Sequence, residues 1–227
     1  MLLNTWVGGK ALDFEDVLEN RRATRKFSNQ QVSDKVITEL VEDAQRAPSL
    51  LNSQPWRVYV AQGDVVDKIR KEFQEMVNAG VPSREDFSKM LKVEWDVFPS
   101  KNMSTMSDNL NFFLRGEMNQ FDDAQEELYD ANTFIYMTIP KKSPAWSLFD
   151  LGAFSQTLML SAVNHGLATM PSHQIVKYPD VIRKYLPIPE DEAIGMAVGL
   201  GYPDKRASIN AYHSKRLPVD SILKIIK

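Results

Sequence analysis

The chain has 227 residues, of which 43% are hydrophobic and 25% charged, values that are ordinary for one globular domain with a sizeable core. The net charge of −3 gives no reason to expect a nucleic acid partner, and the absence of cysteine excludes disulfides, iron–sulfur clusters and thiolate zinc sites. Met1 to Lys10 show no secretory signal and no apolar run is long enough to cross a bilayer, so we expect a cytoplasmic protein without a membrane partner.

Helical and extended patterns follow one another in the first third of the chain. We expect helices from Asp13 to Arg22 and from Asp34 to Ala47, with Ser33 as the N-cap of the second. Residues from Trp56 to Ala61 alternate and favour a strand. A third helix is expected from Asp64 to Gly80, where glycine ends it.

The middle of the chain is irregular. From Val81 to Asn119 it is polar, with methionine and aromatic residues scattered through it and poorly marked helix ends. Segments of this kind often cover binding sites, so we expect residues 62–125 to form a variable helical cap, mobile in part, on a single domain spanning 1–227.

The second half contains two buried strand patterns, from Asn132 to Pro140 and from Ala193 to Leu200. Helices are expected from Ser147 to His165 and from Asp180 to Tyr185. Because helices and strands are mixed without a regular βαβ alternation, the predicted fold class is α+β. At the C-terminus, apolar residues at helical spacing form a stripe that needs a covering surface: Val219, Ile222, Leu223 and Ile226.

Motifs of hydrolases and metalloenzymes are missing from the sequence. His165, His173 and His213 are far apart and lack ligand spacing, and neither HExxH nor GxSxG occurs. No GxGxxG loop follows a strand near the N-terminus, and no carboxylate pair stands out in an apolar setting. If this chain is an enzyme, its reactive group comes from a cofactor.

Four cations follow the first predicted helix, in the stretch Arg21-Arg22-Ala23-Thr24-Arg25-Lys26-Phe27. A solvated basic helix end is the interpretation that these residues alone favour. The other interpretation is an anion clamp, because guanidinium groups bind phosphate oxygens in pairs and stay charged at any working pH.

A second notable stretch, from Ala47 to Trp56, reads APSLLNSQPW. It is either a polar turn before a strand or a loop that presents its amide side chains to a ligand. An amide group carries both donors and acceptors, so it can satisfy the polar edge of a heteroaromatic ring.

Together these two stretches resemble the nitroreductase (flavin reductase-like) superfamily, whose members carry an RRSxRxF-like segment followed by APSxxNxQPWxF. The similarity covers nearly the whole chain apart from residues 62–125. Further matches follow in order: Asp150-Leu151-Gly152 with Gln156, His165 to Pro171, Tyr178-Pro179-Asp180, Ile188-Pro189, Gly199 to Asp204, and Arg216-Leu217-Pro218.

The resemblance implies a nitroreductase-like sandwich with a mixed central sheet flanked by helices, in an intertwined homodimer with one FMN in each of two interface clefts. The residues that it assigns to FMN are Arg21, Arg22, Ala23 and Arg25, the loop residues Ser49, Leu50 and Asn52 acting on the partner's flavin, Pro171, Ser172 and His173 beside the ring, and Arg216 at the phosphate. Ala23 stands where the family has serine, and His213 and Ser214 stand where a second basic residue is common.

The implied reaction is a ping-pong transfer of two electrons from NADH or NADPH, through FMN, to a nitroaromatic, a quinone or a similar flat acceptor. No catalytic side chain and no metal are required. We expect Phe112 and Phe113 in the variable segment to contact the acceptor. Other chemistry of the superfamily, as flavin reductase or reductive dehalogenase, stays open, as does a non-catalytic FMN carrier or sensor. The dehalogenase is disfavoured because residues 81–119 contain no tyrosine.

Overall fold

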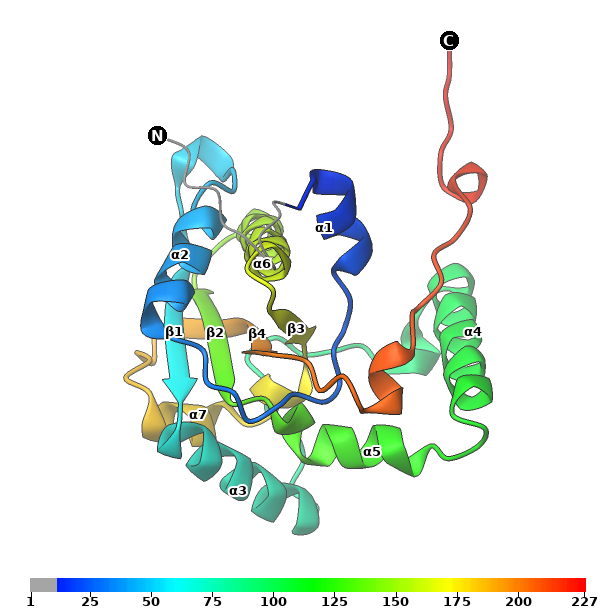
Figure 1. The fold of residues 1–227 in the computed structure, drawn as a ribbon. Coiled ribbons are helices and arrows are strands. Elements are labelled where there is room, and N and C mark those ends of the chain that lie inside the picture. The colour runs from blue at the N-terminus through cyan, green and yellow to red at the C-terminus, as the bar shows by residue number, and fades with distance from the viewer. Residues whose placement is uncertain (1–11) are drawn as a thin grey trace.

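The computed structural model describes residues 12–227, so the expectation for Met1 to Lys10 lies outside the described residues. Figure 1 shows a central sheet with helices on both sides. The helices of the described chain are α1 Phe14–Asn20, α2 Asp34–Ala44, α3 Asp64–Asn78, α4 Val97–Phe113, α5 Asn119–Glu126, α6 Trp146–Asn164 and α7 Pro179–Tyr185. The strands are β1 Arg57–Gln62, β2 Thr133–Pro140, β3 Ala168–Pro171 and β4 Glu192–Gly201. No helix in this part of the chain is long and apolar enough to cross a membrane.

The predicted helices and strands are present, with ends that differ by at most three residues. Ser33 caps α2 as predicted, since its hydroxyl accepts a hydrogen bond from the Val36 N–H at 3.4 Å. α2 ends at Ala44 rather than at Ala47, because the Ala47 N–H donates to the Ala44 carbonyl at 3.0 Å in a turn of three-residue spacing. β3 was not predicted, since it is only four residues long and ends in proline.

The sheet has the strand order β1-β2-β4-β3, and its three strand pairs are all antiparallel. The prediction of a mixed sheet was therefore wrong for these strands. Within residues 12–227, parallel pairing is limited to an isolated bridge between Ala23 and Thr169. Strand direction depends on the path of the long connections, which the hydrophobic pattern of a strand does not encode.

Two hydrophobic cores lie on the two faces of the sheet. Along β2, Phe134 and Tyr136 pack into the core that includes α3 and α7, whereas Ile135 and Met137 pack into the core that includes α2 and α6. This alternation follows the two-residue period of a strand. Seven of the eight β2 residues are buried, which explains why the strand reads as a continuous apolar run.

α6 approaches the sheet closely at Gly195 of β4. A Cβ atom at this position would lie 2.5 Å from Cδ2 of Leu151 and 3.4 Å from a ring carbon of Phe87. The register between β2 and β4 also shifts here, between Met137 and Thr138. Glycine therefore permits both the close approach of α6 and the local irregularity of the strand.

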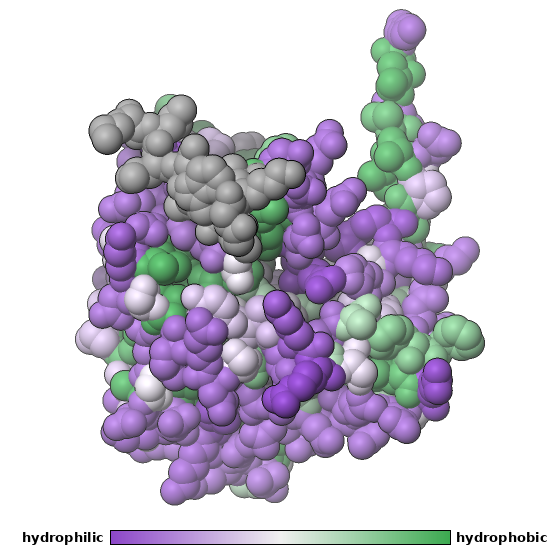
Figure 2. All heavy atoms as spheres, viewed as in Figure 1, coloured by the Kyte–Doolittle hydropathy of each residue, from purple (hydrophilic) through white to green (hydrophobic). Residues whose placement is uncertain are grey.

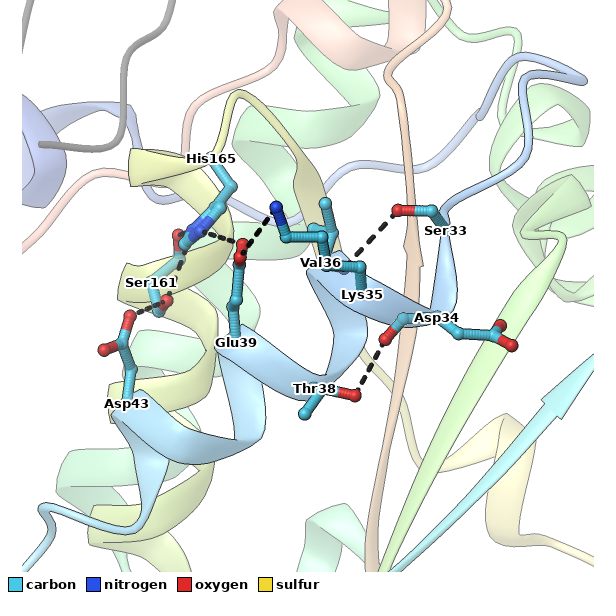
Figure 3. A network of polar contacts seen from close by, with 9 residues as sticks. All are labelled: Ser33, Asp34, Lys35, Val36, Thr38, Glu39, Asp43, Ser161 and His165. Carbon is cyan, nitrogen blue, oxygen red and sulfur yellow. Dashed lines mark hydrogen bonds and ion pairs between the residues drawn. The ribbon is translucent and has the colours of Figure 1, made fainter. Parts of the chain in front are cut away.

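Polar contacts join α2 to α6 (Figure 3). The Ser161 hydroxyl donates to the Asp43 carboxylate at 2.5 Å, and Nε2 of His165 lies 3.3 Å from Oε2 of Glu39. Lys35 extends this row through an ion pair with Glu39 at 3.8 Å. His165 thus belongs to the packing of two helices.

The segment between α3 and α4 is bound to the body of the molecule at several points. The Tyr178 hydroxyl donates to the Val81 carbonyl at 2.8 Å. Asp86 forms an ion pair with Arg183 at 2.7 Å, and both side chains are nearly buried. The helices α4 and α5 follow. The α-helices between α3 and β2 therefore both begin after residue 96.

The C-terminal segment projects away from the body as an extended chain, and its apolar atoms stand clear of the other residues (Figures 1 and 2). The helical spacing of its apolar residues does not produce an α-helix; the one regular element is a 3-10 turn, Val219–Ser221. An isolated segment this short cannot offset the cost of helix nucleation. The side chains of the stripe, Val219, Ile222, Leu223 and Ile226, are exposed, and so is the neighbouring Ile225.

Candidate functional site

The arginine-rich stretch 21–27 runs from the end of α1 along the edge strand β3. The Thr24 N–H donates to the Thr169 carbonyl of β3 at 2.9 Å. The side-chain oxygen of Asn210 accepts hydrogen bonds from the N–H groups of Arg25 and the next residue, at 2.8 and 3.1 Å. The backbone on both sides of Arg25 is therefore fixed.

A cavity of about 220 Å³, which we term the arginine pocket, lies beside this stretch. Five predicted site residues line it: Arg21, Arg22, Ala23, Arg25 and Arg216. The remaining lining residues are Glu19, Tyr212, His213 and Ser214. The fold thus brings the N-terminal arginines together with the C-terminal arginine that sequence analysis paired with them.

The arginines of this pocket carry charge that no carboxylate of the described chain neutralises by an ion pair. Burial, followed by the charge of Arg216, lowers the pKa of Arg21. Burial also lowers the pKa of Arg25, which is only 4% exposed.

Arg25 has an unsatisfied group as well, since its buried Nε has no hydrogen-bond partner among the described residues. A buried donor without a hydrogen-bond partner is costly, and a guanidinium keeps its charge even when its pKa falls. The charge and the vacant donor both suit an oxyanion, and the size of the pocket suits a phosphate group.

Pro171, Ser172 and His173 lie at the end of β3, next to the arginine stretch. The Ser172 hydroxyl donates to the phenolic oxygen of Tyr129 at 3.1 Å. The backbone carbonyl of Tyr129 in turn accepts from the Phe27 N–H at 3.2 Å. The structure therefore brings these three predicted residues beside the arginine stretch, with Tyr129 between them.

His173 pairs with a carboxylate of the middle segment. Its Nε2 lies 3.1 Å from Oε1 of Glu85, whose side chain is 8% exposed. Burial raises the pKa of Glu85, but hydrogen bonds from its own backbone N–H, from Ser83 and from His173 outweigh burial and lower it to about 2. Glu85 is therefore ionised at neutral pH and fixes the position of the His173 ring.

The loop residues Ser49, Leu50 and Asn52 lie apart from the arginine pocket of the same chain, since none of them lines it. The Leu50 N–H donates at 3.3 Å to the buried carboxylate of Asp150 on α6. Leu51 and Asn52 have positive φ angles of 50° and 58° and are exposed. The loop is thus held on α6 with its tip facing away from its own chain.

Phe112 and Phe113 line a second and larger cavity of about 940 Å³, which we term the aromatic pocket. It adjoins the arginine pocket, because Tyr212 and His213 line both. The predicted acceptor residues therefore lie next to the predicted phosphate residues, on the C-terminal part of α4.

Four residues of the site were not predicted from the sequence: Tyr212, Tyr129, Asn210 and Glu85. Each is a single residue in an irregular segment, and no spacing pattern distinguishes it from its neighbours. For Tyr212, its position close to Arg216 in the sequence was the one signal that could have drawn attention to it. His213, which looked like a departure from the family pattern, lines the arginine pocket and lies within hydrogen-bond distance of Nη1 of Arg22.

Comparison with known proteins gives a consistent result. A model of the family described as Nitroreductase family matches residues 18–202. The 4-nitrobenzoate reductase of Pseudomonas putida is 25% identical over 225 residues, which cover 90% of this chain and 91% of that protein. Nitroreductase NfnB of Mycolicibacterium smegmatis is 28% identical over 210 residues, which cover 89% and 88% of the two chains.

Solved structures share the fold. The FMN-dependent nitroreductase NfnB from Mycobacterium smegmatis, in complex with NADPH, aligns with a TM-score of 0.85 at 24% identity over 94% of this chain and 97% of that chain. The FMN and NADPH-dependent nitroreductase NfnB from a Sphigopyxis strain aligns with a TM-score of 0.86 at 22% identity over 95% and 100%. The predicted α+β sandwich is thereby confirmed.

Proposed function

The chain belongs to the nitroreductase family, and from this membership we propose that it is an FMN-dependent oxidoreductase that uses NADH or NADPH to reduce nitroaromatics, quinones or similar flat acceptors. Relatives named for the reduction of nitroaromatics and for the use of FMN and NADPH support the proposal. The observation that carries it is the arginine pocket, whose four arginines lack carboxylate partners in the described chain. A phosphate dianion matches this charge, and the unsatisfied Nε of Arg25 supplies a donor for the polar edge of the flavin ring.

In this proposal Arg21, Arg22 and Arg216 bind the FMN phosphate, while the more buried Arg25 binds the polar edge of the ring. Ala23 contributes backbone only, and its carbonyl already accepts a hydrogen bond from Nη1 of Arg25 at 3.2 Å. FMN, when bound, supplies a ring that takes hydride from the nicotinamide and passes two electrons to the acceptor.

The protein's own contribution is positioning and electrostatics. Arg25 is held by fixed backbone contacts and lies 5.5 Å from the ring centroid of Tyr212, so its charge stays in place in buried surroundings. A fixed positive charge of this kind stabilises negative charge that develops beside it. We assign no catalytic acid or base, since water that enters the open pockets can exchange protons with the ligands.

We further propose a homodimer in which each site is shared between two chains. Exposed apolar side chains support this proposal. They lie on α1, on the N-terminal turn of α6, in the loop after α2 and along the C-terminal segment: Phe14, Leu18, Leu50, Leu51, Trp146, Leu148, Phe149, Leu217, Val219, Ile222, Leu223, Ile225 and Ile226. Burial of such surface by a second copy is favourable. The separation of Ser49 and Asn52 from the arginine pocket of the same chain also fits contacts across the dimer.

The absence of cysteine fits the reducing cytoplasm that we propose as the location of the protein.

The visible spectrum of the purified protein tests the cofactor, and acceptor-dependent oxidation of NADH and NADPH tests the activity. We expect flavin absorption, release of one FMN per chain on heating, and turnover with nitroaromatics or quinones. Free flavin and a halogenated tyrosine serve as alternative acceptors, which distinguish a flavin reductase or a dehalogenase. A colourless protein that also fails to bind added FMN would refute the proposal.

A further inference from the structure

The aromatic pocket has a composition suited to a flat ring. Phe112, Phe113 and Tyr212 line it, and the rings of Phe113 and Tyr212 pack with their centroids 5.5 Å apart. Phe112 is 87% exposed, so its ring is available for stacking on a ligand. The cavity of about 940 Å³ is large enough for a substituted aromatic molecule.

The same pocket is lined by two lysine or arginine side chains and by no carboxylate among the described residues. Arg115 comes from the end of α4, and Lys215 comes from the C-terminal segment. Neither cation takes part in an ion pair within residues 12–227. The nearest acidic residue in sequence, Glu117, accepts a hydrogen bond from Gln120 at 2.6 Å. Two cations that line one pocket without an ion-pair partner among the described residues are notable in a chain whose net charge is −3.

The backbone of Arg115 is held in place. Arg115 adopts a positive φ of 53° and its N–H donates to the Phe112 carbonyl at 3.2 Å, so the chain turns sharply where α4 ends. Lys215 lies between two pocket-lining residues, since Ser214 and Arg216 both face the arginine pocket. The two side chains therefore reach the aromatic pocket from two different segments of the chain, the end of α4 and the C-terminal segment.

We propose that the aromatic pocket selects acceptors whose flat ring carries an anionic group, with aromatic carboxylates as the preferred class. Phe112, Phe113 and Tyr212 contact the ring, and Arg115 and Lys215 bind the anion. This inference rests on the proposed function, because its turnover assay needs that activity. It adds to the proposed function a preference for acceptors with a negative charge. Cations without competing carboxylates favour an anionic ligand over its neutral isostere, because only the anion adds the attraction between opposite charges to the hydrogen bonds.

The experiment compares 4-nitrobenzoate with 4-nitrobenzamide, two acceptors of similar shape that differ in charge. We expect the wild-type enzyme to show a higher kcat/KM for the carboxylate. The ratio of the two kcat/KM values should fall about five- to tenfold in Arg115→Gln and in Lys215→Gln, the loss of one partly exposed charged contact. Lys68→Gln removes an exposed cation of α3 that lines neither pocket, and it should leave the ratio unchanged.

Two further arms decide what the cations bind. If KM for NADPH rises in both variants, KM for NADH does not, and the acceptor ratio stays constant, the cations bind the coenzyme phosphate and the proposal is overturned. Calorimetric titration of the FMN-loaded protein with 4-nitrobenzoate and with 4-nitrobenzamide measures the preference without turnover. If the wild type reduces neither acceptor but binds the carboxylate more tightly, the proposed function fails while the anion site stands. Equal binding and equal turnover of the two acceptors would overturn the anion site alone.

Discussion

The guanidinium group of Arg25 lies 5.5 Å from the ring centroid of Tyr212, and this ring also packs against Phe113 at a centroid distance of 5.5 Å. Tyr212 is 5% exposed, and its hydroxyl donates to the Met106 carbonyl of α4 at 3.2 Å. One side chain therefore links the arginine pocket, the aromatic pocket and α4.

This relationship predicts different outcomes for two substitutions of Tyr212. Tyr212→Phe keeps the ring and loses one hydrogen bond, so the free energy of unfolding should fall by about 0.5–1.5 kcal/mol while FMN affinity is retained. Tyr212→Leu also removes the cation–π contact, worth up to about 2 kcal/mol in a buried setting, and should weaken FMN binding severalfold. Thermal unfolding and fluorimetric FMN titration measure the two effects. Equal FMN affinity in both variants would show that the ring does not position Arg25.

Removal of an arginine from the pocket tests the phosphate assignment. Arg21→Ala and Arg216→Ala should each weaken FMN about ten- to a hundredfold, from roughly 1.5–3 kcal/mol per charged hydrogen bond. Riboflavin, which lacks the phosphate, should bind wild type and variants with similar affinity. Arg206→Ala is the matched control, because this exposed arginine lies outside the pocket. Equal losses for FMN and riboflavin would assign these arginines to another role or to the fold.

Glu85 gives a prediction about pH. Its pKa is about 2 in the folded protein, whereas an unperturbed glutamate has a pKa of about 4.3. The ionised carboxylate therefore stabilises the fold fully above about pH 4.3, and this contribution is lost as the pH falls towards about 2. Glu85→Gln should lower the free energy of unfolding at pH 7 by about 1–3 kcal/mol, with a deficit that shrinks below about pH 4. Denaturant unfolding from pH 7 down to pH 3 measures it, with Glu75→Gln as the control, because the Glu75 side chain on α3 is exposed. A deficit that does not change with pH would show that the ionised carboxylate of Glu85 does not stabilise the fold.

The sequence predicted most of the fold because its buried elements carry strong periodic patterns. β2 is buried on both faces and α6 packs closely on the sheet, so each appears as an apolar run of the right length. The short strand β3 and the direction of strand pairing escaped prediction, since both depend on contacts between distant segments. The C-terminal stripe has helical spacing but forms no α-helix, because no surface of the described residues covers it.

The candidate site could be predicted where several of its residues lie within one sequence motif. Arg21, Arg22 and Arg25 are close in sequence, and the family motif connects them with Arg216. The supporting residues are single side chains brought in by the fold, as Asn210 shows: it holds the Arg25 backbone from 185 residues away. Such long-range hydrogen bonds have no local signature, so they come only from the structure.

The shared site makes a prediction that a monomer cannot imitate. One variant carries Arg22→Ala and Arg25→Ala, and a second carries Ser49→Ala and Asn52→Ala, and each homodimer should be nearly inactive. In our proposal the arginines of one chain and the loop of its partner form each site. A mixed dimer of the two variants then has one site with both defects and one site with neither.

Co-refolding of equal amounts should produce mixed dimers in roughly half of the population by random pairing. Since each of them regains one of its two sites, activity should recover to roughly a quarter of the wild-type value. The separation of Ser49 and Asn52 from the arginine pocket of their own chain is the structural reason to expect recovery. Differently tagged variants allow mixed dimers to be isolated and their FMN content to be counted, with one flavin expected per mixed dimer. If isolated mixed dimers bind no more FMN than the parent homodimers, both sets of residues act on a site within one chain, because only a shared site can separate the two defects.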